Sequence, residues 1–521
     1  MQNLGTGSDS LWSSSGITPD TPAAQQLHAD VCVIGAGIAG LTCAVQLARH
    51  GKAVIVLDMG PVGGGETGRT TAHLANALDD RYTEIERNFG AEGAKLAAES
   101  HTAAIAFIEQ LTRSEQIHCD FTRLDGFLFA PPDESVEILE QELEAAHRAG
   151  VPGVEVVAQA PIPGFDTGPC LRFPHQGQFH PLKYLAGLAQ LIQKRGGHIF
   201  TPQHVTTVEG GSPAKVETKE GLIITAEAVI VATNVPFNDR VVMHTKLFPY
   251  RTYALAARIP RGQVPLGLYW DTLDPYHYVR LQRSENGGSE DYLIVGGEDH
   301  KTGQGHGTEQ ERYTRLEQWA RERFHRMGDI THRWSGEVIE TPDGLAYLGK
   351  NPWDEENVYI VTGDSGMGMT HGTIAGLLIP DLILGRSNPW AELYSPSRKP
   401  LRSLGEYAKE NLNVAAQYAD WVTGGDVKEV GQIAAGSGAV VRRGLKKIAV
   451  YRDEAGTLHE RSAVCPHLGC IVDWNQAEKS WDCPCHGSRF DCKGELLHGP
   501  SPIGLPEVEQ EEAVSEKVAQ G

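Results

Sequence analysis

The sequence contains few of the features that mark membrane-spanning or nucleic-acid-binding proteins. Basic residues are scarce relative to acidic ones, 46 against 67 among 521 residues, and the formal net charge is −21. Nucleic-acid binding depends on Lys and Arg to neutralise phosphate, so this balance argues against it. The best apolar run, residues 374–384, contains Pro380 and Asp381 and is too short to cross a bilayer. We therefore expect no integral membrane segment.

Two further absences concern the N-terminus and the cysteines. Residues 1–29 are polar, without the basic and apolar segments of a secretory signal, and we expect a flexible lead-in there. No cysteine occurs between Cys170 and Cys465. The four cysteines of the first half are scattered, as is typical of free thiols in a reducing compartment. These observations predict a cytoplasmic protein.

The remaining five cysteines lie in one short C-terminal stretch. Four of them fall in the motifs Cys465-Pro-His467-Leu-Gly-Cys470 and Cys483-Pro-Cys485-His486. As ligands, Cys465 and His467 are followed after fifteen residues by Cys483 and His486. Two thiolates and two imidazoles are what a Rieske [2Fe–2S] cluster requires. Tetrahedral zinc is the alternative that these four residues also allow.

Residues 426–510 resemble the Rieske domains of cytochrome complexes, and the resemblance favours the cluster over zinc. In those proteins a second cysteine pair, here Cys470 and Cys485, forms a disulfide between the two cluster loops, although the pair could also stay reduced. Gly499-Pro-Ser-Pro502 resembles their proline loop. The resemblance implies that Ser488 donates a hydrogen bond to sulfur, and that the two histidines bind the more exposed iron, where electrons leave.

A glycine-rich turn near the N-terminus predicts a dinucleotide site. Gly35-x-Gly37-x-x-Gly40 follows a short apolar strand, opens a helix that Gly51 ends, and is followed by a second strand ending in Asp58. The glycines permit a tight turn, close approach of a pyrophosphate and close helix packing, and the acid would bind ribose hydroxyls. The N-terminus of the helix attracts phosphate.

A second glycine-rich loop, residues 363–370, precedes a helix predicted over 374–384. Such a helix N-terminus suits a flavin ring, whose negative charge grows on reduction. Residues 30–386 resemble the flavin-dependent amine and D-amino-acid oxidoreductases of the glycine oxidase type, which implies FAD. Some of these relatives hold the flavin covalently on a C-terminal cysteine, but no cysteine occurs between Cys170 and Cys465, so we expect the FAD to be non-covalent. The implied FAD-binding residues are Gly35, Ala36, Gly37, Ile38, Ala39, Gly40, Asp58, Arg69, Thr70, Thr71, Ala72, Val205, Thr233, Gly363, Gly366, Met367, Gly368, Met369 and Thr370.

Catalytic residues are harder to predict. Two runs near the expected flavin, 276–280 and 296–301, are rich in polar and aromatic side chains. They contain the weak catalytic candidates His277, Arg280, His300 and Lys301. His73, Arg251, Tyr253 and Tyr278 are further polar groups of this region. Most such residues have structural roles, so the catalytic set stays unknown.

The predicted architecture has two folded domains joined by a connector. The first is an α/β FAD-binding Rossmann-like domain, glutathione-reductase-like, with an inserted mixed-sheet substrate domain, and the second is an all-β Rieske domain. Residues 387–425 form a helical connector, and 511–521 an acidic tail.

The predicted function is oxidation of a small amine or amino acid, with electrons passing singly through the cluster to a soluble partner protein. Three alternatives are an oxidase that uses O₂ with a structural or regulatory cluster, reverse electron flow from a donor protein, and a non-catalytic redox sensor.

Overall fold

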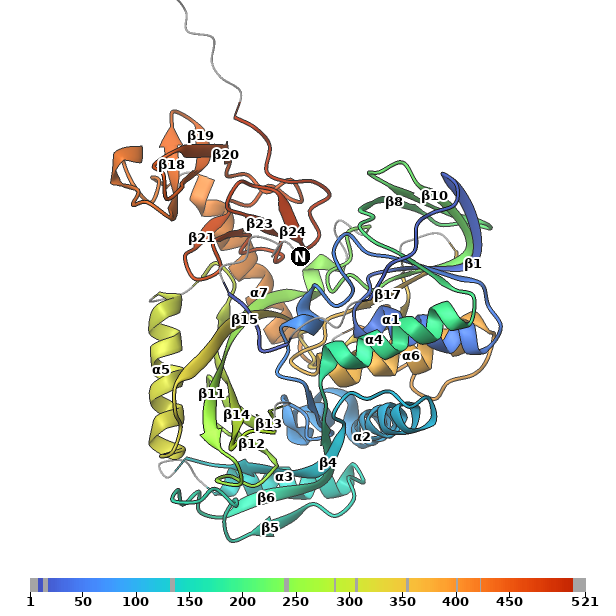
Figure 1. The fold of residues 1–521 in the computed structure, drawn as a ribbon, viewed down its shortest axis with the longest axis vertical. Coiled ribbons are helices and arrows are strands. Elements are labelled where there is room, and N and C mark those ends of the chain that lie inside the picture. The colour runs from blue at the N-terminus through green and yellow to red at the C-terminus, as the bar shows by residue number, and fades with distance from the viewer. Residues whose placement is uncertain are drawn as a thin grey trace, which may run out of the picture.

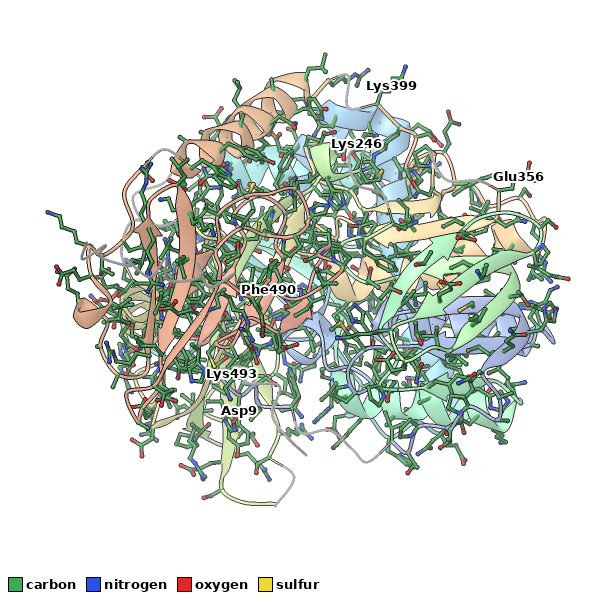
Figure 2. The ribbon with its side chains drawn as sticks, turned by 90° about the horizontal axis from the view of Figure 1, so that it is seen from above. Asp9, Lys246, Glu356, Lys399, Phe490 and Lys493 are labelled. Carbon is green, nitrogen blue, oxygen red and sulfur yellow. A yellow bond between two sulfur atoms is a disulfide. The ribbon has the colours of Figure 1, made fainter. Side chains whose placement is uncertain are left out.

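The computed structural model describes residues 8–12, 17–131, 136–238, 243–284, 287–304, 308–352, 356–399, 402–421 and 423–508. Two large sheets lie next to each other, and a smaller β domain sits on one side of them (Figure 1). Seen from above, the C-terminal strands stand beside the large domains, with Phe490 in the central region (Figure 2). No helix among these residues is long and apolar enough to cross a membrane.

The first sheet is parallel in its centre and is built from short apolar strands. Its path is β16 (Tyr347–Lys350), β17 (Val358–Thr362), β10 (Ile223–Val231), β1 (Gln26–Ile34), β2 (Val54–Leu57) and β7 (His198–Phe200), with β9 (Ala214–Thr218) and β8 (Val205–Glu209) added beside β10. Strands buried on both faces are expected of a parallel sheet covered by helices. The helices packed together on it are α1 (Ile38–Arg49), α4 (Pro181–Lys194) and α6 (Gly368–Ile383) (Figure 1). This is the predicted α/β nucleotide-binding fold.

The second sheet is mixed. Its path is β15 (Ile330–Glu340), β11 (Phe248–Pro260), β14 (Glu290–Lys301), β13 (His277–Gln282), β12 (Leu268–Asp271), β4 (Thr122–Phe129), β6 (Cys170–Gln178) and β3 (His73–Leu74), with β5 (Glu155–Val157) beside β6. All neighbours pair antiparallel except β12 and β4. The helix α5 (Glu309–Arg323) covers β11 and β14, while α2 (Arg81–Ser114) and α3 (Glu137–Arg148) pack on each other. The predicted substrate domain is therefore present.

The C-terminal domain contains only short strands and turns. One sheet consists of β18 (Ser437–Arg443), β19 (Lys446–Arg452) and β20 (Leu458–Ser462), and the other of β21 (Asp473–Asn475), β22 (Ser480–Asp482), β23 (Arg489–Asp491) and β24 (Leu496–His498). The helix α7 (Leu404–Gln417) and the 3-10 turns η3 (Tyr418–Trp421) and η4 (Val430–Gln432) precede it. The all-β fold of the C-terminal domain agrees with the prediction.

Local pairing and backbone geometry set the boundaries of three further elements. The strand β10 is continuous from Ile223 to Val231 because its residues pair in one register with β1. The helix α6 starts at Gly368, six residues before the predicted start. The last residues of the second glycine-rich loop, 368–370, therefore form the first turn of this helix. The helix α2 runs through Gly90, whose φ of 75° kinks it.

The N-terminal residues that the structure describes are packed against the rest of the chain. The Trp12 indole donates to the carbonyl oxygen of Thr70 at 2.6 Å and is only 6% exposed. The Ser8 hydroxyl donates to Glu478 of the C-terminal domain. The first strand already begins at Gln26. These contacts contrast with the flexible lead-in expected for residues 1–29, because polarity alone does not reveal an indole anchored in a core.

Candidate active site and cluster site

One large cavity, with a volume of about 610 Å³, lies where the two sheets and the C-terminal domain meet. The glycine turn before α1 and the loop before α6 line it from the first sheet. Trp270 and Tyr278 line it from the second sheet, and residues 496–499 from the C-terminal domain. All three parts of the chain therefore contribute to a single site.

The glycine turn is shaped by contacts that exclude side chains. Gly35 has a φ of 108°, and a Cβ there would lie 2.3 Å from the Ala232 carbonyl oxygen. A Cβ on Gly40 would lie 1.9 Å from the Gly35 carbonyl oxygen. Gly37 caps α1. The Asp58 carboxylate accepts from the Ala36 N–H at 2.7 Å, and burial raises its pKa to about 6. The open N-terminus and acid fit a dinucleotide.

Most of the residues predicted to bind FAD line this cavity. They are Gly35, Gly37, Ile38, Ala39, Asp58, Arg69, Thr70, Thr71, Val205, Thr233, Gly366, Met367, Gly368, Met369 and Thr370. The other four, Ala36, Gly40, Ala72 and Gly363, stand directly behind the lining. A Cβ on Gly363, for example, would lie 2.4 Å from the Thr341 side chain. These four residues shape the backbone of the turns and do not form part of the cavity surface.

The four weak catalytic candidates lie outside the cavity lining. His277 stacks on Trp319 and binds Asp271 through Nδ1 at 2.9 Å; burial lowers its pKa, but Asp271 and Glu298 outweigh this and raise it. Arg280 is buried and donates to the carbonyl oxygens of Ala72 and Phe179, and burial lowers its pKa to about 9.

The other two candidates belong to β14. His300 stacks on Tyr253, and burial lowers its pKa to about 3. Lys301 binds Glu410 of α7 at 2.6 Å. Of the further polar groups, Arg251 and Tyr253 also lie outside the lining, whereas His73 and Tyr278 belong to it.

The residues that sequence reasoning missed are acids and aromatics on the cavity face. Asp79, Asp299, Trp270 and Tyr276 line the cavity. Strand alternation could have found some of them, because Tyr276 and Tyr278 share one face while His277 points to the other. Asp79 lies in a loop, and no sequence pattern marks it. Its Oδ2 is 1.9 Å from where a Cβ of Gly366 would stand, next to the second glycine loop.

The predicted cluster ligands come together at the tips of two loops of the C-terminal domain. The thiols of Cys465 and Cys483 hydrogen-bond each other, and this bond lowers the pKa of Cys465 against the opposing effect of burial. The His467 and Leu468 N–H groups and the Ser488 hydroxyl also point at its sulfur. Buried sulfurs that receive several N–H donors fit an iron–sulfur cluster. Cys470 and Cys485 form a disulfide between the two loops.

The histidine edge of this site faces the first domain. The rings of His467 and His486 are 5.0 Å apart, and His244 of the turn η2 (His244–Lys246) packs against them at 4.3 and 5.2 Å. His486 is 7% exposed and His244 only 1%. His467 stays partly exposed, whereas the first domain covers His486, and that the two histidines bind the more exposed iron stays a prediction.

A single loop touches both the cluster site and the cavity. The Ser501 N–H donates to the Ser488 hydroxyl at 3.1 Å, and a Cβ on Gly499 would lie 2.6 Å from the Ser488 Cα. Gly499, Ser501 and Pro502 also line the cavity, as does His498. The His498 imidazole contacts Glu66 at 3.2 Å. The predicted proline loop thus lies between the cavity and the cluster site and contacts both.

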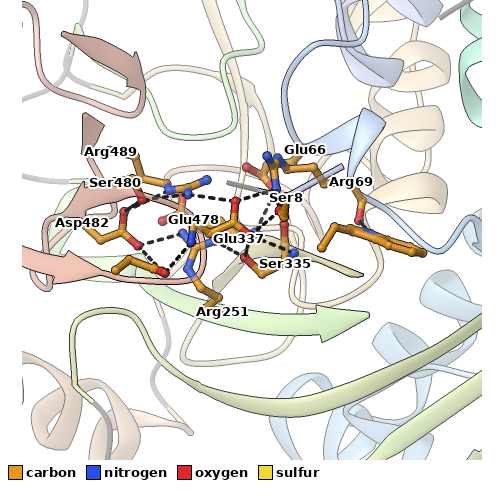
Figure 3. Close-up of polar contacts among 12 residues, drawn as sticks. Ser8, Glu66, Arg69, Arg251, Ser335, Glu337, Glu478, Ser480, Asp482 and Arg489 are labelled. Carbon is orange, nitrogen blue, oxygen red and sulfur yellow. Dashed lines mark hydrogen bonds and ion pairs between the residues drawn. The ribbon is translucent and has the colours of Figure 1, made fainter. Parts of the chain in front are cut away.

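A buried network of charges joins the C-terminal domain to the two sheets (Figure 3). Glu478 binds Arg69 at 3.1 Å, Asp482 binds Arg489 at 3.1 Å, and Arg251 lies 3.4 Å from Asp482. Burial opposes ionisation, but Arg69 and Arg489 lower the pKa of Glu478 to about 2. These carboxylates stay ionised because arginines of different domains surround them.

Comparison with known proteins identifies both domains. Residues 30–382 match the family model described as FAD dependent oxidoreductase (DAO), and residues 421–509 match the Rieske [2Fe-2S] domain. YhfW of Bacillus subtilis, named as a Rieske 2Fe-2S iron-sulfur protein, is 31% identical over 96% of this chain and 97% of its own. Gamma-glutamylputrescine oxidoreductase of Escherichia coli is 27% identical over 69% of this chain and 85% of its own.

Solved structures share the fold of the first domain. Glycine oxidase from Geobacillus kaustophilus superposes with a TM-score of 0.60 at 19% identity, covering 72% of this chain and 99% of its own. L-proline dehydrogenase from P. horikoshii gives a TM-score of 0.57 at 19% identity, covering 72% and 98%. At this identity the likeness establishes the fold alone.

Proposed function

Because the chain belongs to the DAO family of FAD-dependent oxidoreductases and carries a C-terminal Rieske [2Fe–2S] domain, we propose that it oxidises a small amine or amino acid and passes the electrons one at a time to its own cluster. A soluble protein then accepts them. The proline loop carries this proposal, since Gly499 and Ser501 contact the Ser488 loop and line the FAD cavity.

The residues of the cavity would hold the flavin at the sheet edge. The α1 N-terminus and Asp58 suit the pyrophosphate and ribose, and the loop before α6 suits the ring. FAD, when bound, supplies a two-electron acceptor that can give up electrons singly. Cys465, His467, Cys483 and His486 would hold the cluster, with Ser488 and the nearby N–H groups directed at sulfur.

The packing of the histidines against the FAD domain supports an internal electron route. His467 and His486 both pack against His244 of the FAD domain, and His486 is almost fully buried while His467 stays partly exposed, so the histidine edge of the cluster site faces the FAD domain. The relative from Escherichia coli is named for an amine substrate, gamma-glutamylputrescine, which supports oxidation at a C–N bond. The buried charge network supports a fixed position for the Rieske domain during turnover.

The proposal is tested by anaerobic photoreduction of the protein loaded with FAD and cluster. Flavin absorbance and the EPR signal of the reduced cluster are followed together. We expect the cluster signal to grow as the reduced flavin is reoxidised in the dark. A bleached flavin beside an oxidised, EPR-silent cluster would contradict the electron route, and rapid peroxide formation in air would favour an oxidase.

A further inference from the structure

The cavity wall carries two carboxylates, Asp79 and Asp299, that form no ion pair with the described residues. Asp79 accepts a hydrogen bond from the Tyr276 hydroxyl at 3.0 Å, through the oxygen that lies against Gly366. Asp299 lines the same cavity, and its Oδ1 is buried and makes no hydrogen bond. Neither acid has an ion pair among the described residues. Two acidic groups therefore face the cavity without an ion-pair partner among the described residues.

No cation that lines the cavity is available to hold a substrate carboxylate. Among the described lining residues the arginines are Arg69 and Arg489, and no lysine occurs. Arg69 is paired with Glu478, and Arg489 with Asp482. Arg280 lies behind the lining and donates to backbone carbonyl groups. An amino-acid substrate would thus bring its carboxylate into a site that already contains unpaired acids.

Aromatic rings complete the wall around these acids. Tyr276 and Tyr278 lie 5.5 Å apart between ring centroids, and Trp270 stands on the same side. Glycines make room for them: a Cβ on Gly296 would lie 2.1 Å from the Tyr278 ring, and one on Gly126 would lie 2.3 Å from Trp270. Aromatic faces attract cations, and more strongly where water is excluded. The wall and the acids favour the same kind of ligand.

We propose that the substrate is an aliphatic amine that carries a second positive charge and no carboxylate, and that Asp79 and Asp299 bind its cationic groups. This inference rests on the proposed amine oxidation and makes it narrower. The reacting amine group first gives up its ammonium proton to solvent. Its C–N single bond then becomes the C=N bond of an imine, and the two electrons and two protons released in this oxidation would be accepted by bound FAD. Water hydrolyses the imine to an aldehyde and ammonia.

The electrostatics of the cavity agree with this substrate class. Burial, together with the neighbouring Asp299 and Asp364, raises the pKa of Asp79 to about 7, although the hydrogen bond from Tyr276 acts in the opposite direction. Burial likewise raises the pKa of Asp299 to about 7. A carboxyl group with a raised pKa gains most from a cation placed beside it, because the cation restores its ionised form.

The test compares three ligands of one length that differ only at the far end. These are 1,4-diaminobutane, 1-aminobutane and 4-aminobutanoate, which end in an ammonium, a methyl and a carboxylate group. Glycine and alanine serve as amino acids. Each is mixed anaerobically with the protein loaded with FAD and cluster, and the rate constant of flavin bleaching is measured against concentration.

We expect the second-order rate constant for 1,4-diaminobutane to exceed that for 1-aminobutane by at least about tenfold, and those for the three carboxylates by at least about a hundredfold. In Asp299→Asn the ratio of diamine to monoamine should fall toward one. Glu322→Gln, which removes an exposed acid of α5, controls for long-range attraction. If Asp299→Asn does not fold, Asp79→Asn gives the same test.

The outcomes separate this inference from the proposed function. A carboxylate-bearing amine that bleaches the flavin faster than the diamine overturns the substrate class, as does an unchanged ratio in the folded variants. If no amine bleaches the flavin while photoreduction still delivers electrons to the cluster, the substrate class fails and the electron route stands. If the diamine bleaches the flavin and the cluster stays oxidised, the substrate class stands and the route fails.

Discussion

Two pairs of acids, one at the domain junction and one in the cavity wall, have pKa values that are shifted in opposite directions. At the domain junction, Glu478 and Asp482 are surrounded by arginines, and their pKa values are lowered. In the cavity wall, Asp79 and Asp299 have no arginine within pairing distance among the described residues, and burial raises their pKa values to about 7. The junction acids are the more deeply buried pair, yet theirs are the pKa values that are lowered, so the partner decides the sign.

The comparison separates a structural use of buried charge from a functional one. A buried carboxylate that is fully paired within the protein fixes the geometry of the groups around it. One that is left unpaired keeps the protein less stable until a ligand supplies the missing charge, which is why strongly perturbed groups in a cleft indicate function. The junction acids would hold the Rieske domain, and the cavity acids would hold the substrate.

The largest expected effect comes from breaking the junction network. Arg489→Leu leaves Asp482 and Glu478 buried with one partner fewer, and removal of one partner of a buried ion pair typically costs about 3–5 kcal/mol. We expect the free energy of unfolding to fall by about that amount. Chemical denaturation followed by fluorescence measures it, and EPR shows whether the cluster is retained.

An exposed arginine of the same domain is the matched control. Arg443 pairs with Glu460 at 2.6 Å, but its side chain is 46% exposed. Arg443→Leu should change the free energy of unfolding by no more than about 1 kcal/mol, because water screens such pairs. Equal losses in the two variants would mean that the junction network contributes no more than a surface ion pair.

Removing a cavity acid should have the opposite sign. Asp299→Asn eliminates an uncompensated charge, so the ligand-free protein with FAD and cluster should gain on the order of 1–3 kcal/mol at pH 8. A carboxyl group whose pKa is raised favours the folded state at low pH, and this contribution is lost as the pH rises from about 4 to 7. The gain should therefore vanish near pH 4, as denaturation at both pH values would show. Destabilisation at pH 8 would mean that Asp299 has a cationic partner.

The pH dependence of ligand binding sharpens the comparison further. Amines with an ordinary pKa near 10 stay charged between pH 6 and 8, while Asp79 and Asp299 lose their protons there. The affinity for 1,4-diaminobutane should thus rise about tenfold over this range, measured from the flavin spectrum under anaerobic conditions. Domain docking should not change, because Glu478 stays ionised down to a pH of about 2. A flat binding profile would contradict the raised pKa values.

The sequence predicts these regions unequally for physical reasons. Gly35, Gly37 and Asp58 could be predicted because a nucleotide turn fixes residue types at set spacings within one local unit. The cluster motifs are local for the same reason. Asp79 and Asp299 come from a loop and from β14, 220 residues apart, and only the packing of the second sheet on the first brings them to one cavity. The position of the Rieske domain depends likewise on Glu478 reaching Arg69, which no local pattern encodes.

The smallest effect is expected at Lys301, a candidate for catalysis on sequence grounds. Its ammonium binds Glu410 of the connector helix at 2.6 Å, and Lys301 does not line the cavity. The pair is partly open to solvent on the lysine side, so Lys301→Met should lower the free energy of unfolding by only about 1 kcal/mol. The rate constant of flavin bleaching by 1,4-diaminobutane should stay within about twofold, because no reacting group is touched. A hundredfold loss of that rate in a stably folded variant would instead show that Lys301 takes part in the reaction, and the cavity acids would then not be the only charged groups on which the reaction depends.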